Sequence, residues 1–523
     1  MATIGEALQQ ARQLIGAGQF ERAEGIYRQL LAAAPQAAEL WHETGLVQMQ
    51  AGRNEAAIGF LQRATELEPT SATYHSNLGA VYRMLKRNDD AVSSFRRALA
   101  CGPPPAELCN NLALVLKDSG QNDDALRWFD EAVRIRPDFA NAHFNRGNLL
   151  LDLGRLDDAV ESYRRSLALN PGDAGVNCKL GVAHYDQGQL DLALAAFDRA
   201  LLLQPNYPEV RRNRGLALLA QGQYEQGWSE FAWRLECDGF GKRVFAQPQW
   251  DGSPLAGRTL LAHAEQGLGD TLQFIRYAPL VEESGGRVLL DVQASLVPLL
   301  RQSGFGQWIV EPAPNAGFDV QCPLMSLAGH LPDRTGRPFW RQPYLVADPQ
   351  LLADWGTRLG DMPGFKVGIV WSGNPDHPHD RFRSVRLKKF APLAEIPGVQ
   401  LISLQKGASR RELEAVSPVP RLVDLGGELD DRTGAFMDTA AVMRHLDLVV
   451  TVDTSIAHLA GGLGTNVWVA LHASPDWRWL NRGGTTAWYP SMRLFRQTTF
   501  DCWPPVFQEM ALELKRLVAQ GRA

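Results

Sequence analysis

One polar segment in the second half of the chain carries a carboxylate that could act as a base. The segment Glu265–Thr271 reads EQGLGDT and lies between an expected strand and an expected helix. Gly267 and Gly269 permit a tight turn, and Asp270 follows at the start of the helix. A carboxylate there can remove the proton of an acceptor hydroxyl. An ordinary helix cap explains the same aspartate equally well, so both interpretations stay open.

A second segment, TVDTSIAHLAGGLGT at residues 451–465, has the residue types that hold a phosphate. Asp453, Thr454 and Ser455 stand at an expected helix start, where free backbone N–H groups and the helix dipole attract an anion. His458 follows Thr454 by four positions and therefore shares its helix face, within reach of a phosphate. The alternative is a capping run with a core histidine.

Two further strand ends supply polar and basic groups for the same ligand. These residues are Ser372, Asn374, Arg383, Lys388, Gln405 and Lys406. Either Arg383 or Lys388 could neutralise a departing phosphate, although a solvated basic loop explains them as well. At the next strand end, Gln405 could contact a base or ribose and Lys406 a phosphate. The aromatic run Trp477–Trp479 could flank the ligand or pack in the core.

Parallel strands are needed to bring these segments together, and the sequence predicts them in two blocks. The first block has strand candidates at 259–265, 287–292, 307–310 and 318–322, and the second at 366–373, 399–405, 447–453 and 466–472. A proline-rich stretch at 331–349 reads as a linker, and the chain ends in an amphipathic helix at 504–520. Helical patterns between the strands favour two Rossmann-like α/β domains, whose strands end at a shared cleft.

The first 235 residues follow a different rule, a repeat of 34 residues. The prolines that keep this step are Pro35, Pro69, Pro103, Pro137, Pro171 and Pro205, and alanines keep it in a second register from Ala23 to Ala193. Leu-Gly pairs such as Leu78–Gly79 and later aromatics such as Phe95 recur in the units. These residues resemble the tetratricopeptide consensus, which implies an α-solenoid of about six to seven helix pairs.

A ladder of asparagines runs through the repeats at one position of the first helix. Its members are Asn77, Asn111, Asn145 and Asn213. In tetratricopeptide superhelices this position faces the concave groove, and asparagine is not chosen there for helix stability. Carboxamides at regular intervals can bind the backbone of an extended polypeptide. Such a ladder is similar to that of O-GlcNAc transferases, although simple solvation of the helix surface is the alternative.

The bulk composition excludes several classes of protein. A net charge of -5 and a pI near 6.2 give no basic surface for nucleic acid. The six cysteines have no metal-type spacing and predict reduced thiols. No apolar run of membrane-spanning length and no signal sequence are found, which makes the cytoplasm the expected location.

The second half, over about 258–515, resembles lipopolysaccharide heptosyltransferases, which are inverting GT-B glycosyltransferases. The matching motifs are Leu268–Asp270 and the segment Asp453–Ala460. The resemblance implies that Asp270 is the catalytic base, with Gly269 beside it, and that the second motif binds the donor phosphate. Ser455 stands where that family usually has glycine. The absence of an Asp-x-Asp motif in the sequence fits a metal-independent GT-B enzyme.

The whole chain resembles bacterial tetratricopeptide flagellin glycosyltransferases. That resemblance implies transfer of a sugar from a UDP- or CMP-linked donor to Ser or Thr hydroxyls of a protein, possibly flagellin, held by the repeats. The expected domains are a solenoid at 1–235, a connector at 236–257, an acceptor-side domain at 258–345 and a donor-side domain at 346–523. Two alternatives remain, a transferase for lipid or polysaccharide acceptors and a repeat adaptor with a relic catalytic half.

Overall fold

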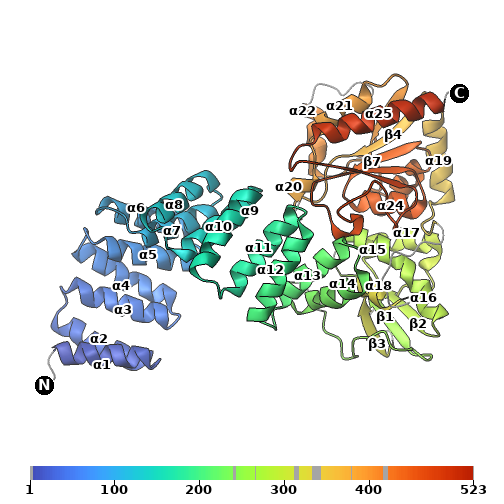
Figure 1. The fold of residues 1–523 in the computed structure, drawn as a ribbon. Coiled ribbons are helices and arrows are strands. Elements are labelled where there is room, and N and C mark those ends of the chain that lie inside the picture. Colours follow the sequence, from blue (N-terminus) through green and yellow to red (C-terminus); the bar gives the residue numbers. More distant parts are fainter. Residues whose placement is uncertain are drawn as a thin grey trace. The chain divides into compact units, whose positions relative to one another are not determined.

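The computed structural model describes residues 4–239, 243–265, 267–310, 317–331, 343–377, 380–415 and 422–521. Parts of the connector expected at 236–257 and most of the linker expected at 331–349 lie outside the described residues. The chain forms two compact units, Met1–Ala183 and His184–Ala523 (Figure 1). The candidate site belongs entirely to the second unit.

The first unit consists of paired helices, as the repeat predicts. They are α1 (Ile4–Gly16), α2 (Phe20–Ala33), α3 (Ala38–Gln50), α4 (Asn54–Leu67), α5 (Ala72–Met84), α6 (Asn88–Ala100), α7 (Ala106–Asp118), α8 (Asn122–Ile135), α9 (Ala140–Asp152) and α10 (Leu156–Leu169). Each periodic proline follows the second helix of its pair by two or three residues. A proline forces the residue before it out of helical geometry, so the helix ends there.

The periodic glycines allow the two helices of a pair to pack closely. A side chain added at Gly79 would lie 2.8 Å from the Phe95 ring, and one at Gly147 would lie 2.6 Å from Tyr163. The periodic alanines are fully buried, as at Ala57 and Ala91. The small residues therefore recur in the repeat because the helices contact each other at these positions, where no larger side chain fits.

A further periodic position forms the turn inside each pair. It has a positive φ at Gly18, Gly52, Gly120, Gly154, Gly188 and Gly222. Lys86 occupies the same place between α5 and α6 with a φ of 58°. Glycine adopts this left-handed conformation without a steric penalty, whereas lysine does not.

The second unit begins within the repeats. Its helices are α11 (Ala174–Asp186), in which the division falls, α12 (Leu190–Leu203), α13 (Pro208–Ala220) and α14 (Tyr224–Phe231). Trp228 of α14 packs edge-to-face on Phe274 at 6.0 Å and on Trp477 at 5.3 Å between ring centroids. The last repeats therefore share a hydrophobic core with the α/β region.

A small parallel sheet follows, in the order β2-β1-β3. Its strands are β1 (Thr259–His263), β2 (Arg287–Asp291) and β3 (Val320–Pro323), and its helices are α15 (Leu268–Phe274), α16 (Ala278–Glu283), α17 (Val297–Leu300) and α18 (Leu327–His330). The strand expected at 307–310 is wrong, since this segment makes only an isolated bridge between Ile309 and Leu290.

The larger sheet is also parallel, with the order β6-β5-β4-β7-β8-β9. Its strands are β4 (Phe365–Val370), β5 (Val399–Ser403), β6 (Leu422–Asp424), β7 (Leu448–Val452), β8 (Val467–Leu471) and β9 (Met492–Arg496). Its helices are α19 (Pro349–Gly360), α20 (Asp380–Arg383), α21 (Ala391–Ala394), α22 (Glu412–Ala415), α23 (Met437–Met443), α24 (Ser455–Leu463) and α25 (Pro504–Gln520). The terminal helix expected at 504–520 is confirmed, and α25 lies against the larger sheet (Figure 1). Its buried residues share a hydrophobic cluster with residues of β4, β5 and β7.

The described part of the chain bears on three other expectations. All six cysteines are free thiols. Within the described ranges, no helix has the length and apolar character required to cross a bilayer. No cluster of three or more potential metal-binding side chains occurs in those ranges either.

Candidate active site

A cavity of about 870 Å³ lies in the second unit where several strands end. Its walls include the segments that follow β1, β4, β5, β7 and β8 at their carboxyl ends. Tyr185, Asp186 and Leu216 add a wall from the repeat helices α11 and α13. Parallel sheets place their ligands at this edge, and the volume is within the range of small-molecule sites.

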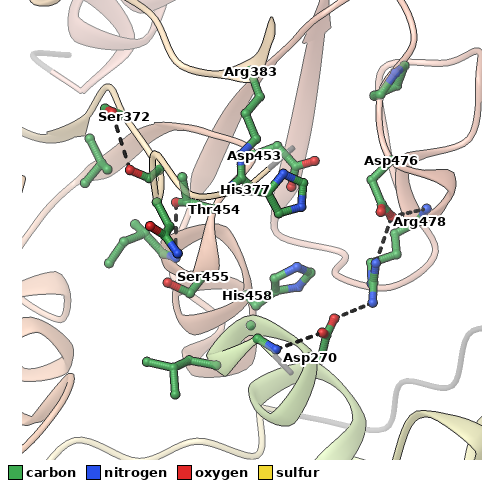
Figure 2. A pocket seen from close by; sticks show the side chains of 18 of the residues that line it. Asp270, Ser372, His377, Arg383, Asp453, Thr454, Ser455, His458, Asp476 and Arg478 are labelled. Carbon is green, nitrogen blue, oxygen red and sulfur yellow. Dashed lines mark hydrogen bonds and ion pairs between the residues drawn. The ribbon is translucent and has the colours of Figure 1, made fainter. Parts of the chain in front are cut away.

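Asp270 lies in this cavity and is held by two hydrogen bonds (Figure 2). Its Oδ1 accepts from Arg478 Nη2 at 2.5 Å, and its Oδ2 accepts from the Gly267 backbone N–H at 3.3 Å. The aspartate is the third residue of α15 and caps the helix from that position. Burial raises its pKa, while the charge of Arg478 opposes that rise. Asp270 thus has a capping role and also presents a carboxylate to the cavity.

Arg478 is one of the site residues that the sequence did not predict. It is only 8% exposed, and its guanidinium also donates to Gln273 at 2.6 Å and to Asp476 at 2.9 Å. The Trp477 ring lies 4.8 Å from the guanidinium carbon. The sequence signal was present, a lone arginine between two tryptophans, but its partner Asp270 is 208 residues away.

The start of α24 opens onto the cavity, as the phosphate hypothesis requires. Thr454 is the N-cap residue, and its hydroxyl accepts from the Ile456 N–H at 3.3 Å. Ser455 also lines the cavity. Asp453 is 9% exposed, and burial together with the nearby Asp476 raises its pKa to about 6. Backbone N–H groups at this helix start can bind an anion.

The structure distinguishes the two basic candidates. Arg383 lines the cavity, and its Nε donates to Asp380 at 3.2 Å. Lys388 is exposed and does not line the cavity. The positive charge of Arg383 lowers the pKa of Asp453 and so opposes the rise that burial causes. Of the two, only Arg383 can meet a charged ligand in the cavity.

The remaining donor-side residues follow β4 and β5 and line the cavity. Gln405 accepts from the backbone N–H groups of Trp371 and Ser372, at 3.0 and 2.9 Å, and donates to the Ser372 carbonyl at 3.1 Å. Through these bonds, the Gln405 carboxamide stabilises the loop after β4. Lys406 forms an ion pair with Asp431 at 2.8 Å, and Asn374 lines the cavity.

Gly269 brings the two halves of the cavity together. A side chain at this position would lie 3.0 Å from His458 Cδ2 and 3.3 Å from the Ser455 Cα. A side chain here would make tighter contacts than side chains normally do, so glycine favours this close approach of the start of α15 to the start of α24. The candidate base, Asp270, is the next residue along the chain.

The asparagine ladder makes contacts within the solenoid. Asn77 bonds His42 at 2.7 Å, and Asn145 donates to Asn110 at 3.0 Å. Asn111 accepts from Asn110 at 3.5 Å, and Asn213, in the second unit, accepts from the neighbouring Arg212 at 2.9 Å. All four residues are partly exposed.

The comparisons with known proteins identify the repeats. Residues 8–72, 61–104 and 110–174 match a tetratricopeptide repeat model, and residues 183–222 match a TPR repeat model. Protein FlbA of Caulobacter vibrioides is 27% identical over 309 residues, which are 52% of this chain and 48% of FlbA. The chain thus spans about half the length of this curated relative.

Solved structures resemble part of the chain. YrrB, a TPR protein with an unusual peptide-binding site, has 24% identity and a TM-score of 0.31, over 35% of this chain and 95% of YrrB. PilW, a type IV pilus biogenesis factor, has 18% identity and a TM-score of 0.38, over 40% of this chain and 96% of PilW. The matches to the repeat models show that the protein carries tetratricopeptide repeats, a scaffold for protein interaction, and a region with parallel sheets follows them.

Proposed function

We propose that this protein is an inverting glycosyltransferase of the GT-B type that transfers a sugar to Ser or Thr hydroxyls of a protein. The observation that carries the proposal is the contact at Gly269, which joins the helix of the candidate base to the start of α24. A carboxylate and an anion-binding helix start therefore face one cavity. An inverting transfer needs this arrangement of a base and a site for the leaving phosphate.

The reaction is a single displacement. Asp270 takes the proton of the acceptor hydroxyl as that oxygen attacks the anomeric carbon. The bond between the anomeric carbon and the phosphate oxygen breaks, and the phosphate leaves with the bonding electrons. Burial favours this step, because it raises the pKa of Asp270 and so makes the carboxylate a stronger base.

The leaving phosphate carries the charge that develops, and cavity groups are placed to stabilise it. The free N–H groups at the start of α24 and the guanidinium of Arg383 are the groups we assign to it. Fixed donors of this kind lower the barrier because they need no reorganisation during the reaction. Asp453 lies beside them, and because burial raises its pKa to about 6, it binds a proton, which reduces repulsion of the phosphate, more readily than an exposed aspartate does.

The repeats are assigned to the acceptor. Tetratricopeptide repeats bind proteins, and the last of them contribute Tyr185, Asp186 and Leu216 to the cavity wall. A polypeptide bound at these last repeats can therefore present a hydroxyl to Asp270. Flagellin is the acceptor suggested by the family resemblance, and UDP- and CMP-linked sugars are the donors it suggests.

The experiment that tests this function begins with the donor. UDP, CMP, GDP and ADP, each alone and as a sugar conjugate, are added to the full chain during thermal unfolding, since a ligand of the native state raises the unfolding temperature. The stabilising donor is then incubated with purified flagellin. We expect one nucleotide to stabilise the protein. A complete lack of stabilisation would favour the repeat adaptor, and transfer only to lipid or glycan would favour the transferase for lipid or polysaccharide acceptors.

A further inference from the structure

A chain of hydrogen bonds behind the cavity begins at Tyr344. Its hydroxyl donates to the Leu272 carbonyl at 2.7 Å, and it accepts from Arg276 Nη2 at 2.7 Å. A carbonyl oxygen can only accept and a guanidinium can only donate. Tyr344 therefore donates its single hydroxyl proton to the Leu272 carbonyl.

Tyr489 continues this chain towards the cavity. Its hydroxyl is hydrogen-bonded to that of Tyr344 and also lies 3.0 Å from His458 Nδ1. Because Tyr344 has no second proton, Tyr489 must donate to it. The Tyr489 hydroxyl then has only lone pairs left for His458, so Nδ1 of the histidine is the donor in that bond.

The local packing fixes the position of these rings. A side chain at Gly461, one turn after His458 on α24, would lie 2.4 Å from the Tyr489 ring. The glycine thus provides the space that brings the Tyr489 hydroxyl to the histidine. Trp479 stacks on the imidazole at 5.3 Å with 20° between the ring planes.

His458 is a neutral imidazole in this environment. It is 5% exposed, and burial lowers its pKa well below the usual range, with Arg478 and Arg276 adding to the effect. A neutral imidazole carries one ring proton. If that proton is on Nδ1, then Nε2 carries a lone pair.

Nε2 is the atom left for the cavity. The His458 ring lines the cavity, and Figure 2 shows it between Asp270 and Asp453. Among the described residues, nothing bonds to Nε2, nor is it one of the buried polar atoms that lack a partner. The atom is therefore accessible to a ligand in the cavity.

We infer that His458 Nε2 is a hydrogen-bond acceptor for a substrate hydroxyl, held in that tautomer by Tyr489 and Tyr344. This differs from the phosphate contact expected from the sequence, because a lone pair repels a phosphate oxygen. The inference rests on the proposed function for its ligand, but the tautomer is a property of the protein alone. Two hydroxyls have the required chemistry, one on the donor sugar and one on the acceptor side chain.

The first experiment determines the tautomer without any ligand. Long-range ¹H–¹⁵N spectra of the full chain with labelled histidine report which ring nitrogen is protonated, and His458→Gln assigns the signal. We expect Nδ1 protonated and Nε2 not. Tyr489→Phe removes the acceptor of the Nδ1 proton, so the signal should move towards the other tautomer. A protonated Nε2 in the unmodified protein would overturn the inference whether or not the protein transfers sugar.

The second experiment identifies the hydroxyl with His458→Gln and the nucleotide that stabilises the protein. If the hydroxyl is on the sugar, the variant binds the sugar conjugate about three- to tenfold more weakly and the bare nucleotide equally well. If it is on the acceptor, both ligands bind normally, and transfer falls while donor hydrolysis persists. A weaker affinity for the bare nucleotide would restore the phosphate role and contradict the inference.

Discussion

Arg478 Nη2 lies 2.5 Å from Asp270 Oδ1, and this ion pair joins the two sheets at the cavity. Asp270 is on the first helix after β1, whereas Arg478 follows β8. The arginine also bonds Asp476, so one buried cation neutralises two carboxylates. The pair restrains the basicity of Asp270, because the positive charge opposes the rise in its pKa that burial causes.

The substitution Arg478→Met therefore has a predicted effect on the pH profile. Without the arginine, the pKa of Asp270 rises further, so its deprotonated form appears only at higher pH. We expect the acid limb of the rate profile for donor turnover to move to higher pH. The substitution also lowers the free energy of unfolding, because the hydrogen bonds of the buried guanidinium to Asp270, Asp476 and Gln273 are lost. Arg482→Met, at an exposed position, is the control and should change neither quantity.

If Arg478→Met does not fold, Arg478→Lys retains a charge with fewer hydrogen bonds and allows the same profile to be measured. An acid limb that stays in place in a folded variant would show that Arg478 does not control the protonation of Asp270.

The raised pKa of Asp453 predicts that the free energy of unfolding changes with pH. Burial raises its pKa from 3.8 to about 6, so the native state binds this proton more tightly than the unfolded state. The resulting stabilisation is complete below about pH 4 and is lost as the pH rises through about 6. Asp453→Asn should therefore raise the free energy of unfolding at pH 8 by up to about 3 kcal/mol and change it little at pH 4.

Denaturant unfolding of the second unit at both pH values measures this difference. Asp361→Asn, at an exposed helix end, serves as the matched control for the exchange of an aspartate for an asparagine. Equal effects of Asp453→Asn at pH 4 and pH 8 would contradict the assigned pKa.

Arg383 and Lys388 offer a matched test of the phosphate site. Both are cations of the same segment, but only Arg383 lines the cavity. Arg383→Gln should weaken binding of the stabilising nucleotide by about tenfold or more, since a charge-assisted hydrogen bond is lost. Lys388→Gln should leave the affinity unchanged. The reverse result, measured by calorimetric titration, would place the phosphate elsewhere.

Replacing Lys86 by glycine is predicted to increase stability locally. It has a φ of 58° in the turn where most other units have glycine. Lys86→Gly should stabilise α5 and α6 by roughly 0.5–1 kcal/mol, because glycine accepts this conformation without a steric penalty. Hydrogen exchange of the amides in the two helices measures the effect. Lys86→Ala retains the penalty, and an equal gain in that variant would rule out backbone strain as the cause.

The 34-residue period predicted the solenoid well because its contacts are local. Each Gly and its aromatic partner, such as Gly79 and Phe95, are 16 residues apart in one helix pair. The strands β4, β5, β7 and β8 were also predicted, since buried parallel strands are continuous apolar runs. The strands β6 and β9 were missed. β6 has three residues, and β9 contains two arginines that interrupt its apolar pattern.

The candidate site was predicted only in part, for a related reason. Asp270 and the segment Asp453–His458 were identifiable because each lies at a strand end. Arg478 acts on a residue 208 positions away, and the Tyr489 hydroxyl contacts a histidine 31 positions earlier. No local pattern encodes such distant contacts. The tautomer inferred for His458 depends on groups of three separate segments, at Leu272–Arg276, Tyr344 and Tyr489, which meet only in the folded chain.

The measurement that tests the central claim most directly is the intact mass of purified flagellin after incubation with the full chain and the stabilising nucleotide sugar. We predict a mass increase by whole sugar residues with the unmodified protein and with Asp361→Asn. With Asp270→Asn, which removes the base, we predict a loss of at least about a hundredfold in the rate of that increase. An unchanged mass with every donor, or an equal increase with Asp270→Asn, would contradict the account.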